Sequence, residues 1–589
     1  MCGIVGYVGS RQALPILLDS LERVTYRGYD SFGVAVLNGR GIDLFKQVGP
    51  VDEQTGSLEM AGTAGIGHTR WATVGAVSRQ NAHPHTDCAN KIAIVHNGDI
   101  DNYRDLRDRL IAEGHTLRSE TDSELIAHLV ENYGGGNLVA AVIRASEDLE
   151  GSYATVVMDY KTRELVVTRN ESPVVIGLGD GEVFVASDAP AIVGYVDRVM
   201  YPEDGDVVLA KADGSVEVYR DGAEITLPVR KLGWNSSQTG KNGYDHFMLK
   251  EIHEQPAALR DTLAIYADGM SGLPAGDVNE VVALACGTSY HAALYAEALL
   301  TADVGMNVRA QIASEYRVGS ASGAGERLVI AISQSGETAD TLNPVRAAKA
   351  QGTPIIGITN VPESSLARLS DTLLQTAAGP EVAVAATKTY TTQMLVLALM
   401  AAELKGDEQG ISALQTEFRS LPGKIEQLLA RSEHIKAAAE WLAGFENTFI
   451  IAKGRQIPVA MEAALKLKEV AYLHAEAGAA GELKHGPFAL LSEKTPVIAI
   501  IPQDEHRTRM ITAIREIAAR GAPVMALVDG ESEEIAEFAT SVITVPMVAP
   551  SISPIIFTVA AQLLSYYCGI ERGCPVDRPR NLAKSVTVL

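Results

Sequence analysis

A cysteine occupies the second position of the chain, directly after the initiator Met1. Removal of Met1, which a small following residue permits, would place the Cys2 thiol beside a free α-amino group. Such an amine has a pKa of about 7.7–8.0, so it can exchange protons with a neighbour near neutral pH. A thiolate is a strong nucleophile, and a nucleophile activated by its own terminal amine is a known arrangement. Taken alone, Cys2 is equally compatible with an ordinary buried cysteine at the start of a strand.

Two hydroxyl-rich loops form a second group of candidate residues. The segments 286–290 (CGTSY) and 333–338 (SQSGET) each follow an apolar run and precede a helical pattern. Ligands bind at the carboxyl ends of parallel strands in open α/β sheets, and helix N-termini favour phosphate. A single serine there would indicate a helix cap. The second loop predicts a phosphate cradle because it offers four polar side chains: Ser333, Gln334, Ser335 and Thr338.

These loops and the cysteine must be positioned by several domains, since 589 residues suggest three or four. The net charge of −23 disfavours nonspecific binding to nucleic acid. The five cysteines contain no C-x-x-C pair and no metal-ligand spacing, which predicts reduced thiols and no metal site. No basic leader precedes Cys2, and no apolar run approaches the roughly 18 residues of a membrane span. We expect a cytoplasmic protein.

Short β-type runs punctuated by turn residues dominate the first ~220 residues. They lie at 3–8, 33–37, 92–96, 153–159, 165–169 and 183–187, with helical patterns at 13–24 and 123–132. This mixture predicts a layered α+β domain with antiparallel sheets. A polar stretch at 232–243 is typical of a linker.

The second half alternates apolar strand patterns with helices, which predicts doubly wound parallel sheets. It also contains an internal repeat: 281–300 resembles 448–468, and 328–358 resembles 497–527, in the same order. Two copies of one domain are therefore expected. The second copy has the acidic segment 502–505 (PQDE) where the first has its serine-rich loop, so we expect one phosphate site per chain, in the first copy.

Six strings in the first half resemble the glutaminase domains of class II amidotransferases, which use an N-terminal nucleophile. They are CGIVGY at 2–7, YRGYDS at 26–31, HTRWAT at 68–73, NAHPH at 81–85, HNGDI at 96–100 and SETDSE at 119–124. The resemblance implies that Cys2 attacks the glutamine carboxamide, with Asn97 and the Gly98 N–H forming an oxyanion hole. It implies that Arg70 binds the glutamine carboxylate and Asp122 its ammonium. It places four more residues around the pocket: Arg27, Trp71, Thr73 and His83.

The second half resembles sugar isomerase domains through SQSGETADT at 333–341. ALACGTSY, ATKTYTTQ, ALKLKEVAY, AGELKHGP and PRNLAKSVTV complete a pattern that resembles the glutamine–fructose-6-phosphate aminotransferase family over nearly the full chain. The resemblance implies glutamine-dependent amination and isomerisation of fructose 6-phosphate to glucosamine 6-phosphate, the first step of amino-sugar (UDP-N-acetylglucosamine) biosynthesis. It implies no cofactor, ammonia channelled between domains with Trp71 as a gate, and at least a homodimer.

The same resemblance assigns the residues of the sugar site. Lys584 forms an imine with the open-chain ketose, Glu469 moves a proton between C1 and C2, and His485, from a neighbouring subunit, opens the ring. Lys466 transfers protons and shares a helical face with Glu469. Because a reactive amine must be uncharged, burial is expected to lower the pKa of Lys584. The sugar-phosphate contacts are Thr288, Ser289, Ser333, Gln334, Ser335, Thr338 and the Val384 backbone.

The predicted domain order follows from these assignments. It is a glutaminase domain at 1–225, a linker at 226–245, a first sugar isomerase domain at 246–405, a helical connector at 406–440, a second sugar isomerase domain at 441–575 and a catalytic tail at 576–589.

Four positions depart from the family pattern: Phe32, Val74, Asp99 and Ala386. Val74 replaces a histidine in a loop that closes over glutamine, and Ala386 removes a hydroxyl near the sugar. A paralogue that aminates another ketose phosphate therefore stays open, as does a noncatalytic sugar-phosphate sensor. A phosphoribosyl-transferring amidotransferase is a weaker alternative, because it needs a different second domain.

Overall fold

The computed structural model describes residues 2–51, 53–232, 240–273, 278–317, 327–406, 408–530 and 533–584, without the side chains of 53–54 and 408–414. These residues divide after Gly240 into two compact units. We call 2–240 the first unit and 241–584 the second unit, and each is described by itself.

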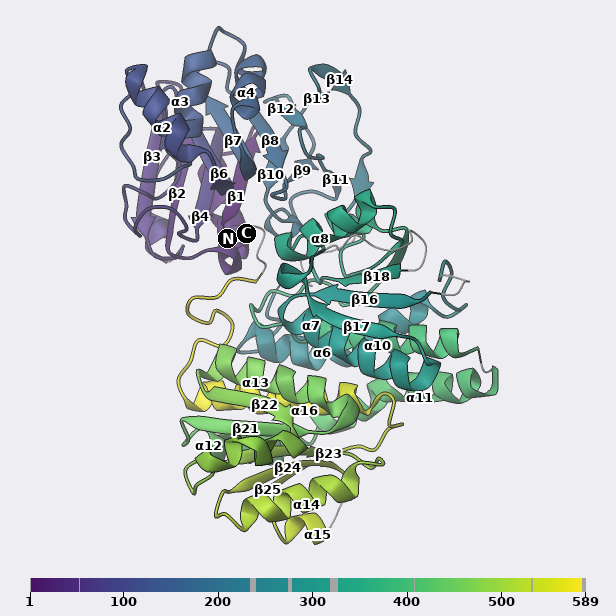
Figure 1. The fold of residues 1–589 in the computed structure, drawn as a ribbon. Coiled ribbons are helices and arrows are strands. Elements are labelled where there is room, and N and C mark those ends of the chain that lie inside the picture. The colour runs from purple at the N-terminus through teal and green to yellow at the C-terminus, as the bar shows by residue number, and fades with distance from the viewer. Residues whose placement is uncertain are drawn as a thin grey trace. The chain divides into compact units, whose positions relative to one another are not determined.

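Two antiparallel sheets form the first unit (Figure 1). Their strands are β1 (Gly3–Val8), β2 (Ser31–Leu37), β3 (Ile42–Val48), β4 (Ala64–Arg70), β5 (His85–Thr86), β6 (Ile92–Ile100), β7 (Gly151–Asp159), β8 (Leu165–Asn170), β9 (Val175–Leu178), β10 (Val183–Ala186), β11 (Arg198–Met200), β12 (Val207–Ala210), β13 (Val216–Arg220), β14 (Ala223–Ile225) and β15 (Arg230–Lys231). One sheet has the order β15-β11-β9-β10-β1-β4-β2-β3, and the other β14-β13-β12-β8-β7-β6-β5. The short strand β15 lies within the predicted linker.

Alternation along the strands explains the layers of this unit. Val95 of β6 packs into the core between the two sheets, whereas its neighbour Ile94 faces the helices on the outer side. Those helices are α2 (Tyr103–Ala112), α3 (Glu124–Tyr133) and α4 (Leu138–Glu147), while α1 (Ala13–Arg23) covers the other sheet. The predicted layered α+β domain with antiparallel sheets is confirmed.

Two parallel sheets form the second unit. Their strands are β16 (Glu280–Ala285), β17 (Val308–Ile312), β18 (Arg327–Ile332), β19 (Ile355–Thr359) and β20 (Thr372–Gln375), then β21 (Asn447–Ala452), β22 (His474–Ala479), β23 (Val497–Ile501), β24 (Val524–Asp529) and β25 (Ser541–Val545). The strand orders across the two sheets are β17-β16-β18-β19-β20 and β22-β21-β23-β24-β25. In each sheet the second strand along the chain lies at one edge, followed by the first, third, fourth and fifth. The predicted duplication of a doubly wound domain is confirmed.

Helices from both copies share one hydrophobic core. They are α6 (Phe247–Ile265), α7 (Gly287–Leu299), α10 (Lys388–Lys405), α11 (Glu408–Leu429), α12 (Glu433–Leu442), α13 (Ile457–Ala471) and α16 (Ser553–Glu571). The helices α8 (Ala339–Ala350), α9 (Ser365–Leu369), α14 (Arg507–Ala518) and α15 (Glu533–Ala536) pack in smaller clusters of their own copy. Tyr295 of α7 and Met394 of α10 belong to the same buried cluster as Leu467 of α13 and Phe557 of α16. The sequence did not predict this shared interior.

Helix α16 is more apolar than the sequence analysis expected. Of the helices in the described ranges, it alone is long and apolar enough to cross a membrane by length and composition. However, 89% of its most apolar window is buried inside the second unit. We therefore interpret α16 as a core helix of the second unit.

Candidate active sites

The first candidate site surrounds Cys2, at the start of β1. The Trp71 N–H donates a hydrogen bond to the Cys2 sulfur at 3.2 Å. The carbonyl oxygen of Cys2 accepts hydrogen bonds from the Asn97 amide at 2.9 Å and from Arg27 Nε at 3.3 Å. Burial raises the pKa of the Cys2 thiol, and the positive charges of the amino terminus and Arg70 offset only part of that effect. The thiol therefore needs a base to become a nucleophile.

The two predicted oxyanion donors lie beside this cysteine on β6. The Asn97 side-chain oxygen lies 3.2 Å from His68 Nε2, which leaves its amide nitrogen directed at Cys2. Gly98 has φ +123°, and a Cβ there would lie 1.9 Å from the Ser152 carbonyl oxygen of β7. The close approach of the paired strand β7 therefore requires a glycine at position 98.

Arg70 is buried and holds the loop that follows β4. Its guanidinium donates to the carbonyl oxygens of Val74 at 2.6 Å, Gly75 at 3.1 Å and Ala76 at 3.2 Å. Burial lowers the pKa of this guanidinium, although neighbouring acidic groups counteract it. Because the contacts use main-chain oxygens, they do not depend on the side chain at position 74. A glutamine carboxylate would have to replace some of these acceptors.

Thr73 and Asp122 approach the far end of β6. The Thr73 hydroxyl donates to Asp99 at 2.7 Å, so the unusual aspartate at position 99 ties this loop to the strand. The Asp122 carboxylate is buried and accepts a hydrogen bond from the Ile100 N–H at 3.0 Å. Asp122 precedes α3, and its partner Ile100 is the next strand residue after Asp99, the partner of Thr73.

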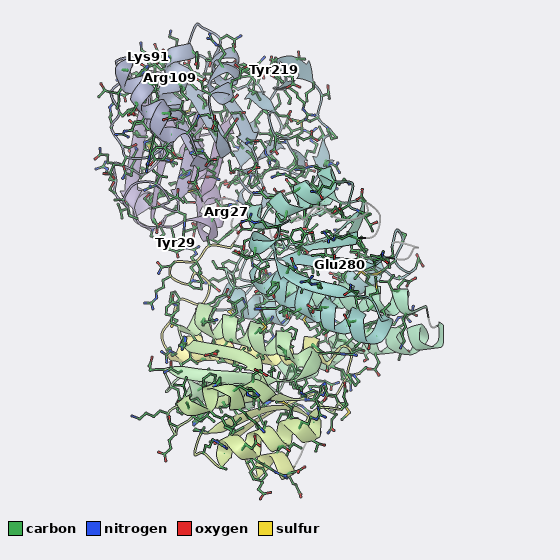
Figure 2. The ribbon with its side chains drawn as sticks, viewed as in Figure 1. Arg27, Tyr29, Lys91, Arg109, Tyr219 and Glu280 are labelled. Atoms are coloured by element: carbon green, nitrogen blue, oxygen red, sulfur yellow. The ribbon has the colours of Figure 1, made fainter. Side chains whose placement is uncertain are left out.

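Arg27 and His83 are both buried in the structure. Arg27 forms an ion pair with Asp188 at 2.9 Å, and Figure 2 shows it near Tyr29, whose ring packs edge-on against Trp71. Asp188 is a functional candidate that the sequence analysis missed, because no motif surrounds it.

His83 contacts other histidines. Its Nδ1 lies 2.9 Å from His68 Nε2, the atom that also contacts the Asn97 amide oxygen. Burial lowers the pKa of His83 well below its usual value, as it lowers that of His68 to about 3. At neutral pH both rings are uncharged, and His68 contacts the Asn97 side-chain oxygen directly.

The second candidate site lies at the sheet edge of the first parallel domain. The loops after β16 and β18 flank the point where the strand order reverses, where open α/β sheets bind ligands. In the second loop, the Ser333 hydroxyl hydrogen-bonds to that of Thr338 at 3.1 Å and accepts from the Gly336 N–H. Ser335 accepts from the Glu337 N–H at 3.2 Å. This loop leads into the N-terminus of α8, as the phosphate prediction requires.

Lys466 of α13 joins the two copies at this edge. Its ammonium donates to the Thr288 hydroxyl of the first copy at 3.1 Å and forms an ion pair with Glu469 of the second. Glu462, one turn earlier, accepts from Thr288 at 3.1 Å and contacts His291 at 2.7 Å. Burial opposes a charge here, but the two carboxylates outweigh it and raise the pKa of Lys466. Lys466 is therefore held as a cation.

Lys584 is buried against Glu381 and forms an ion pair with it. Glu381 also accepts hydrogen bonds from the N–H groups of Thr387 at 2.9 Å and Thr389 at 3.1 Å. Burial would raise the pKa of Glu381, but Lys584 and these donors lower it far below its usual value. From the sequence, burial alone was expected to act on Lys584. A buried carboxylate partner for Lys584 was not foreseen.

The tail that carries Lys584 is fixed to the first parallel domain. The Val384 N–H donates to the Asp577 carbonyl oxygen at 3.1 Å, so a sugar contact from Val384 would use its own carbonyl. The Asp577 carboxylate accepts from the N–H groups of Phe247 and Met248, at 2.9 Å each, in the first turn of α6. An acidic side chain at a helix N-terminus is stabilising.

A second buried acid, Glu251, lies beside this ion pair. It accepts hydrogen bonds from the N–H groups of Val382 at 2.5 Å and Ala383 at 3.2 Å. Burial and the nearby Glu381 raise the pKa of Glu251 to about 8. It is uncharged near neutral pH.

Some predicted residues are not joined to these clusters. Ser289, in the first turn of α7, and Gln334, in the loop after β18, are half-buried. His485 is exposed at the end of a short helical turn (Ala480–His485), and within the described residues it has no hydrogen bond to Lys466, Glu469 or Lys584.

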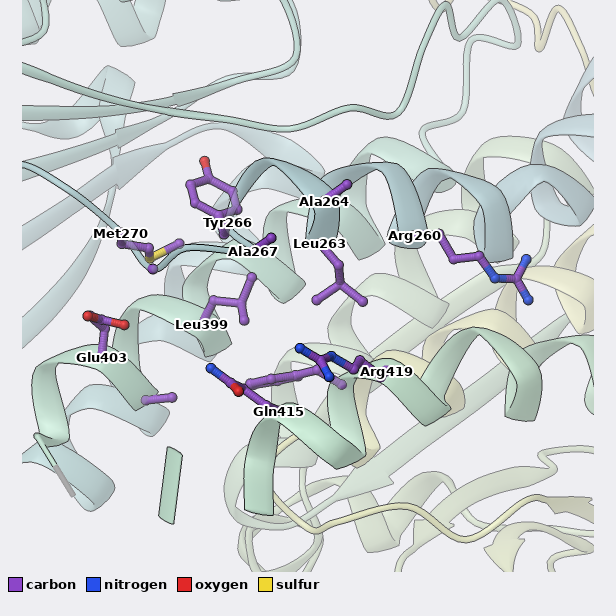
Figure 3. A pocket seen from close by; sticks show the side chains of 13 residues that line it. Arg260, Leu263, Ala264, Tyr266, Ala267, Met270, Leu399, Glu403, Gln415 and Arg419 are labelled. Atoms are coloured by element: carbon purple, nitrogen blue, oxygen red, sulfur yellow. The ribbon is translucent and has the colours of Figure 1, made fainter. Parts of the chain in front are cut away.

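A pocket of about 230 Å³ between α6, α10 and α11 contains none of the predicted residues (Figure 3). Its lining includes Arg260, Tyr266, Leu399, Glu403 and Arg419. It is separate from both candidate sites.

Known proteins match the whole chain. The glutamine amidotransferase domain family matches residues 42–208, and the SIS domain family matches 277–403 and 442–572. Proteins named glutamine–fructose-6-phosphate aminotransferase (isomerizing) from Symbiobacterium thermophilum and Thermococcus kodakarensis are 44% and 42% identical, with 100% of each chain covered. A solved C-terminal domain of glucosamine-fructose-6-phosphate aminotransferase from Francisella tularensis has a TM-score of 0.54 and 36% identity, covering 58% of this chain and 100% of that one.

Proposed function

The chain belongs to the glutamine–fructose-6-phosphate aminotransferase (isomerizing) family, and we propose how its residues divide the reaction of that family. The enzyme transfers the amide nitrogen of glutamine to fructose 6-phosphate and isomerises the product to glucosamine 6-phosphate, releasing glutamate. The first unit frees ammonia, and the second unit uses it.

In the first unit, the Cys2 sulfur attacks the glutamine carboxamide and ammonia leaves, after which water releases glutamate from the thioester. The terminal amine exposed by loss of Met1 is the base that the raised thiol pKa calls for. Asn97 and the Gly98 N–H stabilise the oxyanion, and Arg70 and Asp122 hold the two ends of glutamine. The remaining assigned residues, Arg27, Trp71, Thr73 and His83, position the nucleophile and its loop.

In the second unit, the phosphate binds the hydroxyls and N–H groups of the Ser333–Thr338 loop, with Gln334 and Ser335 among its contacts. Thr288, Ser289 and the Val384 carbonyl contact the sugar. The Lys584 amine replaces the C2 oxygen as an imine, water leaves, and ammonia then displaces Lys584. Glu469 removes a proton from C1 and returns it to C2, which yields an aldose with an amine at C2.

The position of Lys466 is the observation that best supports this assignment of roles to the residues. It contacts Thr288 in the first copy and Glu469 in the second, so a base from one copy lies beside a ligand loop from the other. A fixed cation there would stabilise the negative charge that develops when a proton leaves C1. Lys584 must leave its ion pair with Glu381 and lose a proton to water before it attacks the ketose, because the lowered pKa of Glu381 makes that carboxylate a poor proton acceptor.

The exposure of His485 supports a partner subunit as the place where it acts. A ring-opening histidine must contact the sugar, and His485 has no hydrogen bond to the described catalytic residues of its own chain. We propose a homodimer or higher homo-oligomer in which this histidine completes a neighbouring site.

Incubation of the full chain with glutamine and fructose 6-phosphate, followed by mass spectrometry of the sugar products, tests the proposal. We expect Lys584→Arg to abolish the amino sugar while glutamate release continues. Cys2→Ala should abolish glutamate release but keep amination by added ammonia. Unchanged amino-sugar output from Lys584→Arg, or a mature chain that retains Met1, would refute the residue assignment.

A panel of ketose phosphates tests the sugar specificity that Ala386 puts in question. The proposal expects fructose 6-phosphate to give the highest kcat/KM. A higher value for another ketose phosphate would assign the chain to a different substrate, with the same chemistry.

A further inference from the structure

Four side chains that the reaction does not use converge in the first unit. They come from the turn after β5 (Cys88), the segment after α2 (His115) and one face of α3 (His128 and Glu131). The candidate ligand atoms all lie within 4.8 Å of one another. Cys88 belongs to the turn that also carries Lys91, which is labelled in Figure 2.

Four of the six distances between these atoms match a tetrahedral metal site. In a tetrahedral zinc site, bonds of about 2.3 Å to sulfur and about 2.05 Å to nitrogen or oxygen place S and N ligand atoms about 3.5 Å apart. They place N and O ligand atoms about 3.3 Å apart. Cys88 Sγ lies 3.6 Å from His115 Nδ1 and 3.5 Å from His128 Nδ1. Glu131 Oε2 lies 3.1 and 3.3 Å from the same two nitrogens.

The surroundings of the cluster also suit a metal. The Thr116 N–H donates a hydrogen bond to the Cys88 sulfur at 3.5 Å, a contact that a metal-bound sulfur could also accept. His128 is buried, and its other ring nitrogen, Nε2, lies 3.7 Å from the Glu124 carboxylate without a hydrogen bond in the described structure. A carboxylate behind a ligating histidine orients the ring and increases its basicity.

We propose that Cys88, His115, His128 and Glu131 bind one structural Zn²⁺ per chain. One thiolate, two imidazoles and one carboxylate favour zinc over magnesium or calcium, which prefer oxygen ligands alone. Four protein ligands close the coordination shell, as in structural sites. Binding releases the thiol proton of Cys88 to solvent. No metal site was predicted from the sequence, because these residues form no motif: Cys88 lies 27 positions from His115 and 40 from His128.

The zinc site would stabilise the part of the first unit that is proposed to bind glutamine. It joins the β5–β6 turn to the last two turns of α3, whose first turn follows Asp122. The ion therefore acts on stability first, and on the glutamine reaction through the position of α3. It touches neither substrate nor the reacting atoms.

Metal analysis of the purified full chain tests this assignment. After chelation and re-equilibration with Zn²⁺, the wild-type chain should bind about one ion per chain and regain thermal stability. Cobalt in place of zinc should give a thiolate-to-cobalt absorption band, because Cys88 supplies the sulfur. Cys88→Ser should lose that band and the zinc-dependent rise in Tm.

Cys574→Ser is the matched control, because Cys574 lies outside the cluster and its removal should change neither readout. Glu131→Gln, which keeps the sulfur ligand, should retain a weaker, altered cobalt band even if Cys88→Ser folds poorly. A wild-type chain that binds no zinc, or a cobalt band that survives in Cys88→Ser, would overturn the proposal.

Discussion

The amine of Lys584 contacts a carboxylate, Glu381, that lies 203 positions away in the sequence. The sequence predicted Lys584 because a motif surrounds it. Isolated acidic residues carry no pattern, so Glu381, Glu462 and Asp188 could not be found before the chain was folded. Their roles come from burial beside a cation, which only the tertiary structure creates.

Removal of the Glu381 charge tests its role as a positioning residue. We expect Glu381→Gln to lower amino-sugar formation by about 100-fold, because the amine loses the partner that aims it, at a cost of about 3–5 kcal/mol for a broken buried pair. Glutamate release should stay within about twofold, since the first unit is unchanged. Glu254→Gln removes the partly exposed partner of Lys388 and is the control. Equal product loss in both variants would contradict a specific role for Glu381.

Glu251 gives the second unit a defined pH dependence. Its folded pKa of about 8 exceeds its usual value of 4.5, so the folded chain holds this proton more tightly than the unfolded chain. Stability should therefore fall as pH rises from about 4.5 to about 8, by up to about 1.4 kcal/mol per pH unit. Glu251→Gln cannot ionise and should flatten that slope. Urea unfolding at pH 6 and pH 8 measures it, and identical slopes in both proteins would exclude the effect.

At the scale of elements, apolar alternation and turn residues predicted six of the strands and two of the helices described in the first unit. The predicted runs at 3–8 and 13–24 correspond to β1 and α1. The two-residue strand β15 could not be predicted, because two residues have no period. The distance between α1 and its sheet could not be predicted either, because it depends on which strands pair.

Glycine in β4 sets that distance. A Cβ at Gly65 would lie 2.7 Å from the Ala35 carbonyl oxygen and 2.9 Å from Leu17 of α1. Because a backbone atom cannot move aside, we expect Gly65→Ala to destabilise the first unit by about 1–3 kcal/mol. Gly41→Ala, with nothing within 4 Å of the added Cβ, should change stability little. Thermal unfolding of both variants checks this, and equal Tm values would contradict it.

At the scale of the molecule, the repeat predicted two copies of one domain and the acidic 502–505 segment predicted one phosphate loop. The shared core of α7, α10, α13 and α16 could not be predicted, because each helix is apolar enough for a core of its own. The sequence likewise did not reveal that Lys466 would reach Thr288 across the boundary between the copies.

Mixing two inactive variants tests whether His485 serves a partner's site. His485→Ala and Lys584→Arg should each lose synthesis alone. In mixed dimers, one of the two sites combines an intact Lys584 with the partner's intact histidine. Random pairing makes half of the dimers mixed, so about a quarter of wild-type activity should return. Co-expression with two affinity tags and a product assay measures this. No recovery in purified mixed dimers would place His485 in its own chain's site.

The attachment of Asp577 to the first turn of α6, with Lys584 a few residues further on, has a consequence for synthesis of the protein. A ribosome finishes Cys2 and its neighbours hundreds of residues before it reaches these positions. A growing or prematurely released polypeptide would thus carry Cys2, the proposed glutaminase nucleophile, without Lys584, the amine proposed to capture the ketose. Errors late in translation would waste nitrogen, whereas errors early in translation would yield no chemistry at all.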